Sequence, residues 1–125
     1  MDEATVADWL ERYVIAWRSY DPEEIAALFA TDAVYRYHPW DEVHDAVHGR
    51  DAIATWLAEP DEPGSWVADY RPWAVDGDRA VALGTSRYLA TDEAPEAVFH
   101  NVFLLRFDDD GRCVEFTDVY MQRPD

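Results

Sequence analysis

YDPEEIAALFATDAVYRYHPW, residues 20–40, followed closely by HGRDAI, residues 48–53, is the stretch that decides the expected fold. Asp21 is a suitable N-cap for a helix that begins at Pro22, because Pro lacks the N–H group that would have no partner in the first helical turn. Glu24, three residues after the cap, is placed to complete a capping box. The stretch therefore predicts a short helix, whose apolar face consists of Ile25, Leu28 and Phe29.

A strand and a further helix follow in the same stretch. Thr31-Asp32 is expected to break the short helix. The strand that we expect from Ala33 to His38 ends at Pro39, which cannot donate to a ladder of hydrogen bonds. Gly49 precedes a third helix, whose apolar residues are Ile53, Trp56 and Leu57. A pocket is expected between this strand and the helices.

The rest of the chain divides into one long helix and a series of strands. From about Glu3 to Ser19, apolar residues recur at helical spacing: Val6, Trp9, Leu10, Tyr13, Val14 and Trp17. The segment from Glu59 to Gly64 is interpreted as a loop. Turn residues then separate four long strands, which span residues 66–75, 79–89, 97–107 and 112–122.

This order of elements predicts an α+β fold for a single domain of residues 1–125. Consecutive strands joined by short turns form an antiparallel meander. We therefore expect a curved antiparallel sheet that wraps around three N-terminal helices. Six Trp, seven Tyr and five Phe are more than packing alone requires in a chain of this length, so we expect some of them to line a cavity.

The composition limits the partners and the location of the protein. The formal net charge is −17, from 27 acidic and ten basic residues, and all ten basic residues are Arg. Such a chain repels nucleic acids and anionic membranes, so we expect neither as a partner. Cys113 is the single cysteine, which excludes an internal disulfide. Because no long apolar run and no signal-like start are present, we expect a cytoplasmic protein.

A long helix, the DPEEIAALFATDAVYRYHP and GRDAI segments, and four strands with RFDDDGR before the last one follow each other in an order that resembles the nuclear transport factor 2-like superfamily. This superfamily includes SnoaL-like proteins and ketosteroid isomerases, and the resemblance covers nearly the whole chain. It implies a cone-shaped, cystatin-like roll with a pocket for a small apolar or aromatic molecule. It also implies that no cofactor is needed and that two copies form a homodimer through the outer face of the sheet.

The resemblance further implies roles for individual residues. Tyr13 falls where ketosteroid isomerases carry the tyrosine that donates a hydrogen bond to the developing enolate. His38, next to Pro39, falls close to the position of their aspartate base, and a neutral imidazole can accept a proton. Phe103 stands where these enzymes have their second oxyanion donor, so steroid isomerisation itself is not expected.

Asp118 and six further residues complete the candidate site. Asp118 shares a strand face with Phe116 and Tyr120, and it is a candidate second acid/base or a partner that fixes the His38 tautomer. The residues expected to bind substrate are Trp17, Tyr35, Trp56, Asn101, Phe103 and Tyr120. The combination of tyrosines, histidine and asparagine also resembles scytalone-dehydratase-like members, so isomerisation, cyclisation and dehydration all stay open.

Structural roles compete with these assignments. A Tyr on the buried face of a helix often bonds a backbone carbonyl, and a single His near a strand end often has no catalytic role. A non-catalytic ligand-binding or dimeric interaction module of the same fold is therefore an open alternative to an enzyme. The spacing of His44 and His48 is similar to that of a zinc motif, but Gly49 follows at once and the required Glu is missing, so we expect no metal site.

Overall fold

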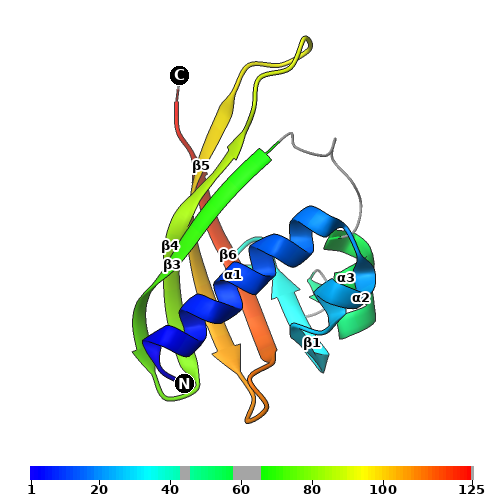
Figure 1. Ribbon diagram of the computed structural model, residues 1–125, viewed down its shortest axis with the longest axis vertical. Helices are drawn as coiled ribbons and strands as arrows, with labels where there is room; N and C mark the ends of the chain where they lie inside the picture. The colour runs from blue at the N-terminus through cyan, green and yellow to red at the C-terminus, as the bar shows by residue number, and fades with distance from the viewer. Residues whose placement is uncertain (43–45, 58–65, 125) are drawn as a thin grey trace.

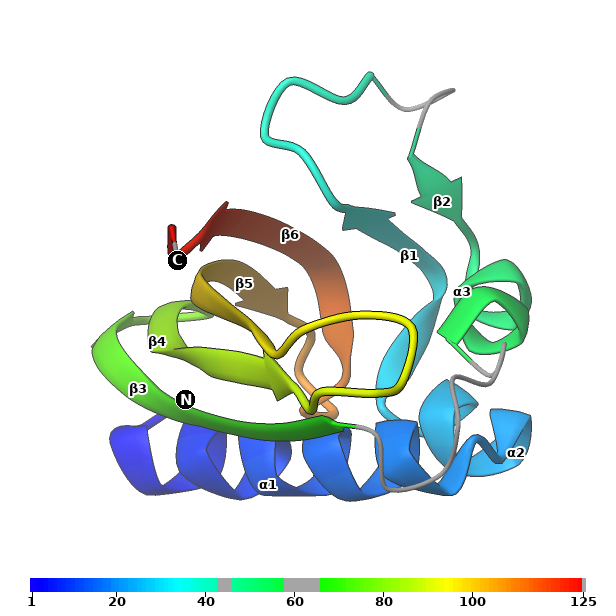
Figure 2. The same cartoon turned by 90° about the horizontal axis from the view of Figure 1, so that it is seen from above.

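The computed structural model describes residues 1–42, 46–57 and 66–124. The helices are α1 (Glu3–Ser19), α2 (Pro22–Ala26) and α3 (Arg50–Leu57), and the strands are β1 (Phe29–Arg36), β2 (Val47–His48), β3 (Trp66–Asp76), β4 (Arg79–Tyr88), β5 (Ala97–Phe107) and β6 (Cys113–Gln122). The sheet curves, and α1 lies along its concave side while α2 and α3 lie beside β1 (Figures 1 and 2). The predicted α+β fold, with a curved sheet around N-terminal helices, is confirmed.

The sheet is open and mixed. Its strand order is β2-β1-β6-β5-β4-β3, so β2 and β3 are the two edges. Strands β3, β4, β5 and β6 form the predicted antiparallel meander. Strand β1 pairs in parallel with β6, and the short β2 pairs antiparallel with β1. The parallel pairing brings the strand nearest the N-terminus next to the last strand of the chain.

Strand β1 differs from its predicted boundaries at both ends. It begins at Phe29, so the predicted break at Thr31-Asp32 is wrong. The register against β6 shifts between Phe29 and Val34. The side chains of Thr31 and Asp32, which lie in this irregular part of the strand, are exposed. Because β1 ends at Arg36, His38 lies in the bend that follows the strand.

Two caps turn the chain from α1 into α2. Tyr20 ends α1 in the left-handed conformation, with φ at 53°, and its N–H donates to the carbonyl of Trp17. Asp21 then caps α2 as predicted, because its carboxylate accepts a hydrogen bond of 2.9 Å from the N–H of Glu23. The tight turn places α2 against the end of α1 (Figure 1).

Aromatic side chains join the first half of α1 to the sheet. The indole N–H of Trp9 donates to the carbonyl oxygen of Leu28 at 3.2 Å. The Trp9 ring also packs edge to face against Phe29 and Phe107, an arrangement that aromatic pairs favour. Core side chains fill this part of the concave face, and the pocket begins one turn later along α1, at Tyr13.

Several other predictions concern regions outside this core. The predicted loop from Glu59 to Gly64 lies outside the described residues, as does His44. On the outer face of the sheet, where a second copy is expected, Leu104 and Met121 are exposed, and the homodimer stays a prediction. Within the described part of the chain, none of the helices is long and apolar enough to cross a membrane.

Gly84 allows β3 and β4 to approach each other closely. A Cβ atom at this position would lie 2.0 Å from the carbonyl oxygen of Asp69 and 2.7 Å from the Cα atom of Tyr70, its cross-strand partner. We expect Gly84→Ala to lower the free energy of unfolding by about 1–3 kcal/mol, because the backbone of β3 has to move away. Urea denaturation measures the change, and a variant as stable as the wild type would contradict the close approach.

Candidate functional site

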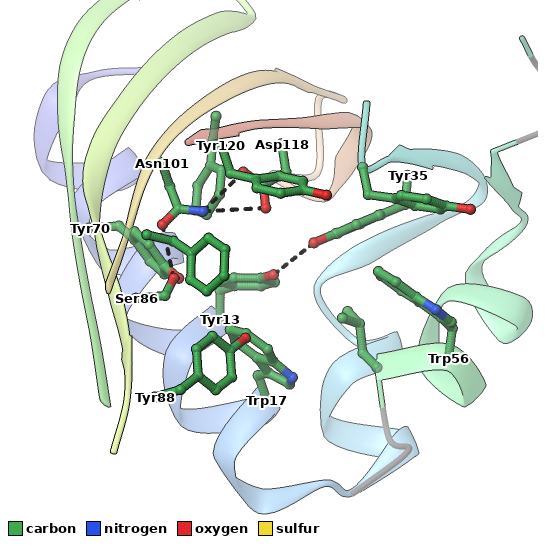
Figure 3. A pocket seen from close by; sticks show the side chains of 14 residues that line it. Tyr13, Trp17, Tyr35, Trp56, Tyr70, Ser86, Tyr88, Asn101, Asp118 and Tyr120 are labelled. Atoms are coloured by element: carbon green, nitrogen blue, oxygen red, sulfur yellow. Dashed lines mark hydrogen bonds between the residues drawn. The ribbon is translucent and has the colours of Figure 1, made fainter. Parts of the chain in front are cut away.

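A pocket of about 480 Å³ lies between α1, β1, α3 and the inner face of strands β3 to β6. Fourteen side chains line it, and ten of them are Tyr, Trp or Phe (Figure 3). Eight residues of the predicted site are among these fourteen: Tyr13, Trp17, Tyr35, Trp56, Asn101, Phe103, Asp118 and Tyr120. The structure therefore brings together residues from opposite ends of the sequence in one cavity.

Asp118, on β6, supplies the carboxyl group of the pocket. Burial raises the pKa of this group to about 6, although a hydrogen bond from Asn101 acts in the opposite direction. The Nδ2 atom of Asn101 lies 3.1 Å and 3.4 Å from the two carboxylate oxygens. A carboxyl group with this pKa exchanges its proton close to neutral pH, which is the property that a general acid/base needs.

A chain of hydrogen bonds, each donated toward Asp118, holds the Asn101 amide in this orientation (Figure 3). The hydroxyl of Ser86 donates its single proton to Oδ1 of Asn101, at 2.9 Å. Ser86 Oγ therefore accepts a hydrogen bond from the hydroxyl of Tyr70, which lies 2.5 Å away. Because its oxygen is engaged with Ser86, Asn101 presents its N–H to Asp118 and stabilises the ionised carboxylate.

Tyr13 and Tyr35 form a second polar pair in the pocket, with their hydroxyl oxygens 3.1 Å apart (Figure 3). Burial raises the pKa of both hydroxyls well above the ordinary value, and the charge of Asp118 raises both further. Both tyrosines are therefore protonated at neutral pH. One of the two protons forms the hydrogen bond within the pair, so the other proton is available for an oxygen atom of a ligand.

His38 lies beside the pocket and is not part of its wall. Its ring stacks on Trp40 with ring centroids 4.7 Å apart, and Nδ1 lies 3.4 Å from a carboxylate oxygen of Asp41. The side-chain partner of His38 Nδ1 is therefore Asp41 and not Asp118. Nε2 lies 3.5 Å from the hydroxyl of Tyr120, which does line the pocket. The structure places His38 at the rim and does not bring it together with Asp118.

Six lining residues were not predicted: Tyr37, Leu57, Tyr70, Ser86, Tyr88 and Phe99. Alternation along β4 was the signal that could have found Ser86, because it shares a strand face with Ala80 and Ala82, which are both buried. The sequence does not show that this hydroxyl has a polar partner on the next strand. That information is present only in the cross-strand register.

The described residues form neither a metal site nor a reactive thiol in this pocket. In residues 1–42, 46–57 and 66–124, no three His, Cys, Asp or Glu side chains are grouped so that they could hold a metal ion. The Cys113 thiol is fully buried in the core, and burial raises its pKa far above the ordinary value. The reactive groups of the pocket are therefore the Asp118 carboxyl group and the tyrosine hydroxyls.

The fold and the pocket define a cone-shaped α+β protein with a half-buried carboxyl group in an aromatic cavity. The chain belongs to the SnoaL-like domain family, whose model matches residues 10–116. This membership confirms the resemblance to the nuclear transport factor 2-like superfamily. A search of curated proteins finds no match to the chain.

Solved structures with low sequence identity share the fold. A protein of unknown function with a cystatin-like fold from Methylobium petroleophilum has a TM-score of 0.71 and 20% identity, covering 100% of this chain and 80% of the other. An LEH-like epoxide hydrolase from M. tuberculosis has a TM-score of 0.69 and 17% identity, covering 95% and 84%. An uncharacterised protein from Silicibacter pomeroyi has a TM-score of 0.60 and 19% identity, covering 94% and 75%.

Ser86→Ala tests the chain of hydrogen bonds. Without the Ser86 hydroxyl, the Asn101 amide is free to rotate its oxygen toward Asp118, so we expect the pKa of Asp118 to rise above about 6. A pH titration of the Asp118 carboxyl ¹³C resonance measures the change. Thr85→Ala, at the neighbouring position on the opposite strand face, is the matched control. An equal midpoint in Ser86→Ala and the wild type would contradict the role of Ser86.

Asp118→Asn tests the burial of the carboxyl group through stability. The pKa of Asp118 is about 6 in the folded protein and ordinarily 3.8, so ionisation destabilises the folded state as the pH rises from about 4 to 6. We therefore expect the variant to have a free energy of unfolding about 1–3 kcal/mol higher than the wild type at pH 8 and no higher at pH 4. Urea denaturation at the two pH values measures both differences.

Asp92→Asn, at an exposed position in the loop between β4 and β5, is the control for the general loss of one negative charge. An equal stabilisation by the two variants at pH 8 would show that net charge, and not burial at Asp118, causes the effect.

Proposed function

We propose that this protein is a cofactor-independent acid/base catalyst, an isomerase, cyclase or dehydratase, for a small apolar or aromatic molecule that carries a carbonyl or hydroxyl group. One observation carries the proposal: a carboxyl group with a pKa of about 6 shares an aromatic cavity with a pair of protonated hydroxyls. Membership of the SnoaL-like domain family supports a role for the cavity as a small-molecule site.

The proposed reaction begins with a proton transfer from carbon. The ionised carboxylate of Asp118 accepts a proton from a carbon atom next to the substrate carbonyl, and the electrons of the C–H bond form an enolate. The available hydroxyl proton of the Tyr13–Tyr35 pair forms a hydrogen bond to the carbonyl oxygen, where negative charge develops. Asp118 then returns the proton to a second carbon in an isomerisation, or to a departing hydroxyl group in a dehydration.

The environments of the two polar groups suit these different roles. Asp118 has a pKa near neutrality, so it can exist in both protonation states during turnover. The pKa values of Tyr13 and Tyr35 are raised, so these residues act as hydrogen-bond donors and not as bases. Asp118 takes the role of base in place of His38, because His38 lies at the rim beside Asp41.

Two other functions would use the same pocket. The first is epoxide hydrolysis, since the similar M. tuberculosis structure is that of an LEH-like epoxide hydrolase. In this reaction, Asp118 would activate a water molecule and a tyrosine hydroxyl would donate a hydrogen bond to the epoxide oxygen. A non-catalytic binding module would need the aromatic walls but no carboxyl group with a raised pKa. The test of the proposal therefore includes substrates for each reaction and a binding measurement.

We expect turnover of at least one ketone in a panel of β,γ-unsaturated ketones, β-hydroxy ketones and epoxides, whereas turnover of the epoxides alone would favour an epoxide hydrolase. Asp118→Asn should lower kcat by about 10²- to 10⁴-fold, because the base is lost and the amide keeps the shape of the side chain. The wild-type rate should rise with pH to a plateau above about pH 6, where Asp118 is ionised. Tyr13→Phe/Tyr35→Phe, the double variant, should lower kcat by about 10²-fold through loss of the donor.

Asp92→Asn is the control and should keep the wild-type rate. Turnover by Asp118→Asn at the wild-type rate would contradict the role of Asp118. Binding of panel compounds without any turnover would favour the non-catalytic module.

A further inference from the structure

Among the described residues that line the pocket, one side chain carries a negative charge at neutral pH and none carries a positive charge. Asp118 is the one Asp or Glu among the fourteen described residues that line it, and none of the fourteen is Arg, Lys or His. Within the described part of the chain, the hydrogen bonds that the carboxylate accepts come from the amide of Asn101. Among the described residues, the causes that shift the pKa of Asp118 are its burial and the Asn101 hydrogen bond, and neither is a basic side chain. A half-buried carboxylate without a cationic partner is costly, and a ligand with a positive charge would supply that partner.

Arginines on the sheet have other partners. Arg106 pairs with Glu115 at 3.1 Å, and Arg87 pairs with Glu96 at 3.9 Å. The guanidinium group of Arg123 donates to the ring of His100. Arg87 and Arg106 alternate with the pocket-lining residues along β4 and β5, so they lie on the outer face, and Arg123 follows the end of β6. These three arginines therefore do not compensate the charge in the pocket.

Aromatic rings surround the open side of the pocket. Trp56 and Tyr120 are the most exposed of the lining rings, at 39% and 44%, and mark the mouth. Tyr37 stacks against Trp56 with ring centroids 5.6 Å apart, and Trp17 and Tyr88 lie across the cavity from Trp56 (Figure 3). The faces of such rings are electron-rich and attract an ammonium group, most strongly at Trp.

We infer that the substrate of this pocket is an organic cation, in which a protonated or quaternary amine accompanies the carbonyl or hydroxyl group. The ammonium group lies among the rings of the mouth, where the ring faces and the charge of Asp118 both attract it. The oxygen atom of the substrate then reaches the Tyr13–Tyr35 pair deeper in the cavity. The reacting end of this substrate rests on the proposed function, whereas the cation site requires binding alone.

The same arrangement disfavours anionic substrates. A carboxylate or phosphate group in this cavity would meet Asp118 without a basic side chain to offset the repulsion. The net charge of −17 acts in the same direction at longer range, because it attracts cations to the protein and repels anions.

Three phenyl compounds with tetrahedral head groups separate charge from shape: phenyltrimethylammonium, tert-butylbenzene and benzenesulfonate. Isothermal titration calorimetry measures the three affinities in about 1 M KCl, because this salt concentration screens nonspecific attraction between the cation and the acidic surface. We expect phenyltrimethylammonium to bind about tenfold or more tightly than the neutral compound. Benzenesulfonate should not bind.

Two tryptophan variants test whether binding occurs at the mouth. Trp56→Leu keeps an apolar side chain but removes a ring face, so the affinity for the cation should fall by about fivefold, with little change for tert-butylbenzene. Trp73→Leu, an exposed position on β3 outside the pocket, is the matched control and should change neither affinity. Equal or tighter binding of tert-butylbenzene, no binding of the cation, or equal losses in the two variants would overturn the inference.

The outcome can be separated from that of the proposed function. Cation binding at Trp56 without turnover of any panel compound, including ketones of both classes that carry a trimethylammonium group, would leave the cation site standing and contradict catalysis. Turnover of neutral ketones, combined with no preference for the cation in calorimetry, would leave catalysis standing and overturn the cation site.

Discussion

The Asp118 carboxylate, held among aromatic rings with an amide as its hydrogen-bond donor, is the constraint on which the rest of the site depends. Removing a carboxylate from water without a basic partner destabilises a folded protein. The chain from Tyr70 through Ser86 and Asn101 limits this cost by directing an N–H group at the carboxylate. Its four members come from β3, β4, β5 and β6, so the antiparallel meander delivers one polar residue per strand to the same wall.

Helix α1 divides the concave side of the sheet into core and pocket. Trp9 packs among aromatic rings of the core, and Tyr13 and Trp17 follow at intervals of four residues on the same face of the helix. The packing that fixes Trp9 therefore also fixes the Tyr13 hydroxyl opposite Tyr35 on β1. A hydrogen-bond donor held in this way needs little rearrangement when charge develops on a ligand oxygen.

The parts of the fold that depend on local signals could be predicted from the sequence. The cap at Asp21 and the turns between the later strands are local, whereas the parallel pairing of β1 with β6 joins distant segments that no local pattern links. Alternation along the last strands was sufficient to select Asn101 and Asp118. The position of His38 depends on the end of β1 at Arg36, and the role of Ser86 depends on its partner on the next strand, which no local pattern shows.

The titration of the Asp118 carboxyl group in the wild-type protein is the most direct measurement. Its ¹³C chemical shift, assigned by comparison with Asp118→Asn, reports the protonation of this one residue among 27 acidic side chains. We expect a midpoint at about pH 6, as burial in the aromatic cavity requires. A midpoint at the ordinary value of 3.8 would show that the carboxylate is well solvated, and it would contradict both the general base and the uncompensated charge in the pocket.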